Sequence, residues 1–236
     1  MRSKSLLWSL CFMFAASTLL VAASWAGTVT GTVKYEGEVP KFAELKMDAD
    51  PICLAKHSGP AYPDTLVLGD GNTMANVFVY VKSGLAKKDY PVPQEPVVID
   101  QQGCQYSPHV FGVRVGQPLK ILNPDGTLHN VHALSKVNPE FNIAMPQFRK
   151  EIIQTFDKEE FMFPLKCDVH PWMAAWGAVM SHPFFTVTGK DGKFTIPGLD
   201  AGTYEVEAWH EKLGTQTATL TVTADAQTLT DFTFKR

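Results

Sequence analysis

Apolar and polar residues alternate along much of the chain, in stretches rich in Val, Thr, Tyr and Phe. These stretches are residues 27–35, 75–84, 109–116, 118–123, 193–198, 203–211 and 215–224. Alternation with a period of two predicts strands that bury one face. Turn signals separate them, at Asp70-Gly71-Asn72, Pro124-Asp125-Gly126 and Lys190-Asp191-Gly192. Short strands at this spacing predict an all-β protein built from sandwiches, without a long amphipathic helix.

The first 26 residues have a different character. Arg2 and Lys4 precede an apolar run from Leu6 to Val21, and Ser24-Trp25-Ala26 places small residues where a signal peptidase reads the chain. This pattern predicts a cleavable signal peptide over residues 1–26 and a periplasmic or secreted protein. Cys11 has no lipobox around it, so a lipid anchor is not expected. The run is also short for a membrane span, so no membrane insertion is expected after cleavage.

About 210 residues remain, which suffice for one large or two small domains. Their composition limits the classes of partner and activity to be expected. The leading segment takes two of the 21 basic residues and none of the 24 acidic ones, and 19 against 24 leaves a net charge of −5. A mildly acidic chain without a Lys/Arg run gives no reason to expect nucleic acid or anionic lipid as a partner. It also carries no GxGxxG, P-loop, nucleophile elbow or HExxH motif, so an enzyme is not expected.

Three cysteines follow the leading segment: Cys53, Cys104 and Cys167. In an oxidising compartment two of the three should pair, and one should be left over. If Cys167 is kept as a thiolate for a metal, Cys53 and Cys104 pair by elimination.

The stretch "CDVHPWM", residues 167–173, places a thiol, an imidazole and a thioether on one short loop. The stretch is too compact for a zinc finger, which would need a second Cys/His pair. Its single cysteine also disfavours a binuclear copper centre and an iron–sulfur cluster. Two histidines and one thiolate with a weak axial methionine are the ligands of a mononuclear copper centre for electron transfer. This set needs one more histidine. The stretch "NPDGTLHNVHALS" supplies His129, which follows a polar turn and starts a predicted strand.

Residues 97–183 resemble the cupredoxin family of amicyanin-like blue copper proteins. The resemblance rests on the glycine turn at Gly116, the strand that ends in Asn123, the His129-Asn130-Val131 triplet, and the Cys-x2-His-Pro-aromatic-Met form of residues 167–173. It implies one copper ion cycling between Cu(I) and Cu(II). The equatorial ligands would be His129, Cys167 and His170, with Met173 axial. It also implies that Asn130 hydrogen-bonds the ligand loop and holds it in place.

Other residues of the same region are expected to support the site, or are histidines with more than one possible role. Pro171 stiffens the loop between two ligands, and Trp172 is expected to cover the metal or to extend an apolar docking surface. His132 lies three positions after His129 on the same strand, so its side chain should point away from the metal and is a weaker candidate for an extra ligand. His109 and His182 could form a second copper or docking site, or be satisfied polar residues near strand ends. His57 and His210 are expected to be structural or exposed.

The stretch from Thr186 to Val222 resembles the carboxypeptidase regulatory-like domain, a transthyretin-like β-sandwich. The resemblance rests on an Asp-Gly turn, a strand and the pattern Gly-Leu-x-x-Gly-x-Tyr, carried by Gly192, Gly198, Gly202 and Tyr204. It implies adhesion, folding support or ligand presentation, and no catalysis.

Residues 27–40 and 75–84 look like the beginning of that same sandwich, yet its continuation comes only after the copper loop. We therefore predict a Greek-key cupredoxin sandwich, residues 95–183, inserted into a discontinuous regulatory-like or immunoglobulin-like sandwich of residues 27–92 and 184–236. The chain would cross between them at residues 90–96 and 181–185.

The expected function is that of an exported blue copper protein that exchanges single electrons with a redox protein still to be identified. A copper-handling role, as chaperone or in resistance, would use the same ligands with an exchangeable ion. A third possibility is an adhesion or scaffold protein without metal. Because the chain has no Met-rich tract, electron transfer is favoured over copper handling.

Overall fold

The computed structural model describes residues 26–236, so the predicted signal peptide lies, except for its last residue, outside the described part. Strands dominate these residues, together with one short helix, α1 (Pro51–Ala55), and a single 3-10 turn, η1 (Asp70–Asn72). No helix among residues 26–236 is long and apolar enough to span a membrane.

Each of the seven alternating stretches contains a strand. The strands of the described residues are β1 (Gly27–Glu36), β2 (Phe78–Ser83), β3 (Val97–Gln102), β4 (Gln105–Ser107), β5 (Val110–Arg114), β6 (Leu119–Leu122), β7 (His129–Ala133), β8 (Phe141–Met145), β9 (Glu151–Gln154), β10 (Glu160–Lys166), β11 (Ala174–Met180), β12 (Phe185–Val187), β13 (Lys193–Leu199), β14 (Gly202–His210), β15 (Gly214–Val222), β16 (Gln227–Leu229) and β17 (Phe232–Lys235).

Two sheets made from the ends of the chain form one sandwich, here called the terminal sandwich. One sheet has the order β13-β1-β16, with β17 also paired to β1, and the other has the order β12-β2-β14-β15. Val29 and Val33 of β1 share a buried core with Tyr204 and Val206 of β14. Both sheets therefore combine strands from before and after the central part of the chain.

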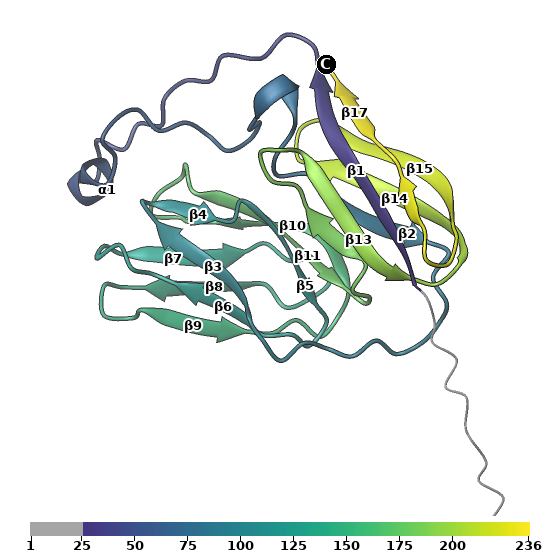
Figure 1. Cartoon of the computed structure of the whole chain (residues 1–236). Helices are drawn as coiled ribbons and strands as arrows, with labels where there is room; N and C mark the ends of the chain where they lie inside the picture. Colours follow the sequence, from purple (N-terminus) through teal and green to yellow (C-terminus); the bar gives the residue numbers. More distant parts are fainter. Residues whose placement is uncertain (1–25) are drawn as a thin grey trace, which may run out of the picture.

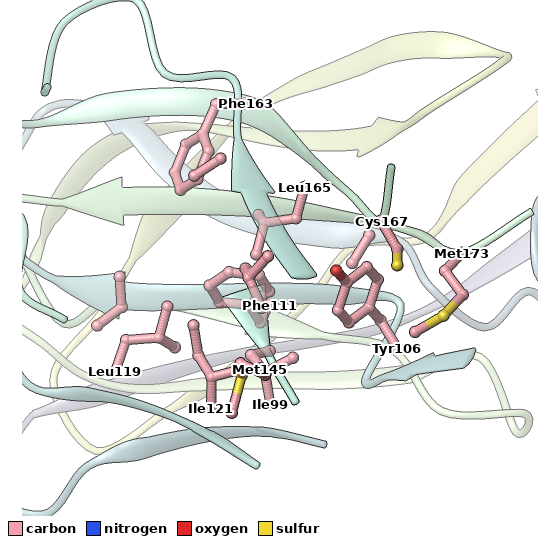
Figure 2. Close-up of a cluster of buried hydrophobic side chains, with 14 of the residues drawn as sticks. Ile99, Tyr106, Phe111, Leu119, Ile121, Met145, Phe163, Leu165, Cys167 and Met173 are labelled. Carbon is pink, nitrogen blue, oxygen red and sulfur yellow. The ribbon is translucent and has the colours of Figure 1, made fainter. Parts of the chain in front are cut away.

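Strands β3 to β11 form a second sandwich, here called the central sandwich. Its sheets have the orders β5-β11-β10-β7-β8 and β4-β3-β6-β9. The core between them contains Ile99 and Ile121 from one sheet and Phe111 and Leu165 from the other (Figure 2). The predicted all-β class with two sandwiches is confirmed, and Figure 1 shows the two units side by side. The predicted domain boundaries, between residues 92 and 95 and between residues 183 and 184, stay predictions.

The two sandwiches meet through a small apolar cluster. Phe78 and Tyr80 of β2 pack there with Val110 of β5 and with Met180 of β11, and all four are buried. At one edge, Nε2 of His109 lies 2.6 Å from Oε1 of Glu211. This interface restrains the orientation of the central sandwich relative to the terminal one.

The connection between β1 and β2 leaves the terminal sandwich and reaches the far end of the central sandwich, where it forms α1 (Figure 1). Asp50 caps this helix by accepting hydrogen bonds from the amides of Ile52 and Cys53, and Pro51 takes the first helical position. A disulfide joins Cys53 to Cys104, which follows β3. The connection is thereby tied to the central sandwich at the end where the predicted ligand loop lies.

Candidate metal centre

Three predicted ligands come together at one end of the central sandwich. His129 is the first residue of β7, Cys167 directly follows β10, and His170 lies three residues further along the loop. Their side chains are buried, and their ligand atoms lie within 4.8 Å of one another. The two Nδ1 atoms of the histidines are 2.9 Å apart, and Sγ of Cys167 is 3.8 Å from Nδ1 of His170.

The ligand loop closes on itself through its own backbone. The amide of Met173 donates to the carbonyl of His170 at 2.9 Å, and the amide of Cys167 donates to the carbonyl of Met173 at 3.3 Å. Met173 is only 1% exposed. Figure 2 shows the sulfur atoms of Cys167 and Met173 at the same end of the core, next to Tyr106. The loop thus holds all three of its candidate ligands against the sandwich.

Asn130 fastens this loop to β7. Its side-chain oxygen accepts hydrogen bonds from the amides of Asp168 at 2.7 Å and Val169 at 3.3 Å, and from the Cys167 thiol at 3.4 Å. Its amide nitrogen donates to Asn142 on β8 at 2.6 Å. One side chain therefore links the strand that carries one ligand to the loop that carries the others.

Two aromatic side chains support the same end of the sandwich. The hydroxyl of Tyr106 donates to the carbonyls of Asn130 at 2.6 Å and Lys166 at 3.0 Å, which holds β7 and β10 together just before the ligands. The indole of Trp172 donates to the carbonyl of Cys104 at 3.0 Å, and its ring lies 5.0 Å from that of His170. Trp172 thus covers His170, a candidate ligand, while Pro171 is exposed on the loop.

Cys53 and Cys104 form a disulfide, and Cys167 is the free cysteine of the described residues. Two other groups of donors lie nearby: Asp50, Cys53 and His170, and Cys104, Asp125 and His129. Each of these groups contains a disulfide sulfur, which has no thiolate to offer. Among the described groups, the one with His129, Cys167 and His170 therefore has the free thiol.

Sequence reasoning missed two carboxylates that contact the Nε2 atoms of the two candidate ligand histidines. Oδ2 of Asp125 lies 3.1 Å from Nε2 of His129, and Oδ2 of Asp50 lies 3.0 Å from Nε2 of His170. The turn Asn-Pro-Asp-Gly explains Asp125 as an ordinary turn residue, so its second role was hidden. Nothing in the sequence signals the contact of Asp50 with His170, because 120 residues separate the two.

The buried charges of the site hold one another in place. Burial alone would raise the pKa of Asp125, but its hydrogen bonds to His129 and to two backbone amides bring it to about 2. Burial opposes the charge of His129, yet hydrogen bonds with Asp125 and Cys167 raise its pKa to about 9. Burial also opposes the thiolate of Cys167, but His129 and neighbouring amides lower the pKa of that thiol. The carboxylate of Asp125, the imidazolium of His129 and the thiolate of Cys167 therefore stabilise one another.

The donors present fit a copper ion. Each ligand histidine faces a carboxylate with Nε2, so in the neutral ring Nε2 carries the proton and Nδ1 keeps the lone pair. Two such Nδ1 atoms and the Cys167 sulfur converge on one point. Two imidazoles and one thiolate, with a buried thioether on the same loop, are a donor set that suits mononuclear copper.

The other histidines lie outside this cluster. The ring nitrogens of His132 are each 3.0 Å from a carboxylate, one from Asp168 and one from Glu140. His109 pairs with Glu211 between the two sandwiches, and His182 accepts a hydrogen bond from the amide of Phe184. Of the last two, His57 contacts the carbonyl of Gly103, and His210 is buried in the terminal sandwich.

Comparison with known proteins gives a match to one family and several structural likenesses. Residues 180–235 match the carboxypeptidase regulatory-like domain, which confirms that part of the sequence interpretation. Among curated proteins the chain matches none.

Several solved structures are similar to part of this chain. A copper-containing nitrite reductase from Thermus scotoductus SA-01 is 20% identical with a TM-score of 0.34, over 43% of this chain and 26% of that protein. The Cu(I) form of an amicyanin mutant is 22% identical with a TM-score of 0.33, over 44% of this chain and 99% of amicyanin. A purple cupredoxin from Nitrosopumilus maritimus is 20% identical with a TM-score of 0.30, over 35% of this chain and 98% of that protein.

Proposed function

We propose that the central sandwich binds one copper ion through His129, Cys167, His170 and Met173 and that the exported protein transfers single electrons. The observation that carries this proposal is the convergence of two Nδ1 atoms and one free thiol, all buried, at one end of the sandwich. Bound copper would supply the one-electron chemistry by alternating between Cu(I) and Cu(II).

The residues around the donors suit rapid electron exchange because they allow little movement. Tyr106 ties together the two strands that lead into the site, and Asn130 ties the loop to one of them. A ligand set held by the fold changes little between oxidation states, which keeps the reorganisation small. Burial of His129, Cys167 and His170 to 2% exposure or less also excludes water from the metal.

The burial of the site also argues against the two alternative functions, copper handling and a scaffold without metal. A chaperone or resistance protein must release its ion, whereas here the connection that carries α1 is fastened over His170 by a disulfide. A scaffold protein without metal has no use for a free buried thiol beside two imidazoles. Catalysis is not part of the proposal.

Visible and EPR spectra of the mature protein after addition of Cu(II) test the proposal. A thiolate bound to Cu(II) in a trigonal field should give an intense charge-transfer band, and Cys167→Ser should abolish it. His129→Ala and His170→Ala should each destroy the coloured site. His132→Ala is the matched control, because this histidine is on the same strand but contacts Asp168 and Glu140. A band that persists in the Cys167→Ser variant would refute the assignment.

Exchange measurements separate electron transfer from copper handling. A fixed redox centre should keep its copper during hours of incubation with a moderate chelator in both oxidation states. Rapid loss of Cu(I) to the chelator would favour the handling role instead.

A further inference from the structure

We infer that Asp50 and Asp125 are positioning residues of the copper centre: each holds the Nε2 side of one ligand histidine, and their two negative charges favour Cu(II) over Cu(I). This inference rests on the proposed function, since it concerns the same site. The juxtaposition that carries it is a carboxylate 3.0 or 3.1 Å from each of the two ligand imidazoles.

Asp125 is held in place by contacts with the protein alone. Its side chain is fully buried, and its two oxygens accept hydrogen bonds from the amides of Gly103 at 2.9 Å and Cys104 at 2.7 Å. The ammonium group of Lys56 lies 3.4 Å away. Because both oxygens are held in this way, the carboxylate can accept a hydrogen bond from His129 in one direction only. The ring of His129 is therefore oriented by a rigid acceptor.

Asp50 orients the ring of His170 in the same way, from another part of the chain. Its Oδ1 accepts from the amide of Ile52 at 2.8 Å, while its Oδ2 accepts from the hydroxyl of Thr127 at 3.0 Å and faces Nε2 of His170. Asp50 belongs to the connection between β1 and β2, so a residue outside the central sandwich completes its copper site. This connection also covers the ring edge of His170, whose side chain is only 3% exposed.

The disulfide links the two carboxylates. Cys53 follows Asp50 by three residues, and its sulfur lies 3.5 Å from Nε2 of His170. Its partner Cys104 donates its amide to Asp125 and accepts from the indole of Trp172. The bridge therefore joins the backbone segments that place both acceptors, which gives it a role at the metal in addition to its role in stability.

Two carboxylates at the Nε2 atoms of the imidazoles should lower the reduction potential of the copper. Negative charge one imidazole ring away from a buried metal stabilises the ion with the higher charge more strongly. Hydrogen bonding to a carboxylate also makes a ligand imidazole a better donor. Both effects act in the same direction, so the oxidised form is favoured and the reduction potential falls.

The test is the reduction potential of the copper-loaded mature protein with Asp50→Asn or Asp125→Asn. Asparagine keeps the size and an acceptor oxygen but removes the charge. Each variant should lose at least tenfold in its preference for Cu(II) over Cu(I), which is a rise of about 59 mV for a one-electron couple. Glu140→Gln is the control, because this exposed carboxylate contacts the non-ligand His132, and its potential should stay at the wild-type value.

The outcomes distinguish this inference from the proposed function. If wild-type protein with Cu(II) shows no thiolate-to-copper band, both are wrong. If the band is present and the Asp50→Asn and Asp125→Asn potentials match that of Glu140→Gln, only the present inference is wrong. Should Asp125→Asn fail to fold, Asp50→Asn still decides the point, since Asp50 lies in the outer connection and is 19% exposed in its side chain. A merely structural role would lower the melting temperature and leave the potential unchanged.

Discussion

Loss of the Cys53–Cys104 disulfide should destabilise the protein substantially. The bridge spans 51 residues of sequence, and the loop-entropy relation for such a span gives roughly 4 kcal/mol at 25 °C. Measured bridges generally contribute about 2 to 4 kcal/mol, so the calculated value is an upper figure. Both cysteines are fully buried in the core of the central sandwich. A change in packing must therefore be separated from the effect of the bridge itself.

The assay is urea unfolding of the copper-free mature protein, followed by circular dichroism and tryptophan fluorescence. Wild-type protein is compared with and without a thiol reductant, which breaks the bridge and keeps both sulfur atoms in the core. Cys53→Ala/Cys104→Ala then adds the loss of packing, and its stability should fall below that of the reduced wild type. The reasoning is refuted if reduction lowers the free energy of unfolding by less than about 1 kcal/mol, well below the range expected for bridges.

Two further predictions concern the frame around the site. Tyr106→Phe should lower the free energy of unfolding by about 1 to 3 kcal/mol in urea titrations, because the carbonyls of Asn130 and Lys166 lose their shared donor; an unchanged midpoint would show that these carbonyls find other partners. Glu160 should make stability pH-dependent: burial opposes its charge, but hydrogen bonds from Ser135, Lys136 and Asn138 lower its pKa from 4.5 to about 2. The contribution of ionised Glu160 to the free energy of unfolding is thus complete above pH 4.5 and is lost as pH falls toward 2. Glu160→Gln should weaken this acid sensitivity in urea midpoints measured from about pH 6 to about pH 3, and equal slopes for the two proteins would contradict the role.

Strands with one buried and one less buried face, such as β1, were the easiest to predict. β1 alternates buried and less buried positions along its whole length, as a period of two requires. β11, by contrast, is buried without interruption from Gly177 to Met180. It lies between β5 and β10 and also faces the terminal sandwich, so both of its faces are covered. Burial on two sides removes the alternation that would have revealed it.

The candidate ligands were accessible to sequence reasoning because most of them are local. Cys167, His170 and Met173 lie within one short loop, and its backbone hydrogen bonds bring them together. His129 is distant in sequence, but the polar turn and the following strand placed it. His132 could be set aside by strand geometry, and in the structure its ring lies between the carboxylates of Asp168 and Glu140.

What surrounds those ligands was decided by tertiary structure. The chain itself determines the alternating strands and the spacing of the ligand loop, because both depend on neighbours within a few residues. The approach of Asp50 to His170 depends on the path of a long connection that crosses from one sandwich to the other and is fastened there by Cys53 and Cys104. No local pattern encodes a contact across 120 residues, since it depends on where the fold places the connection.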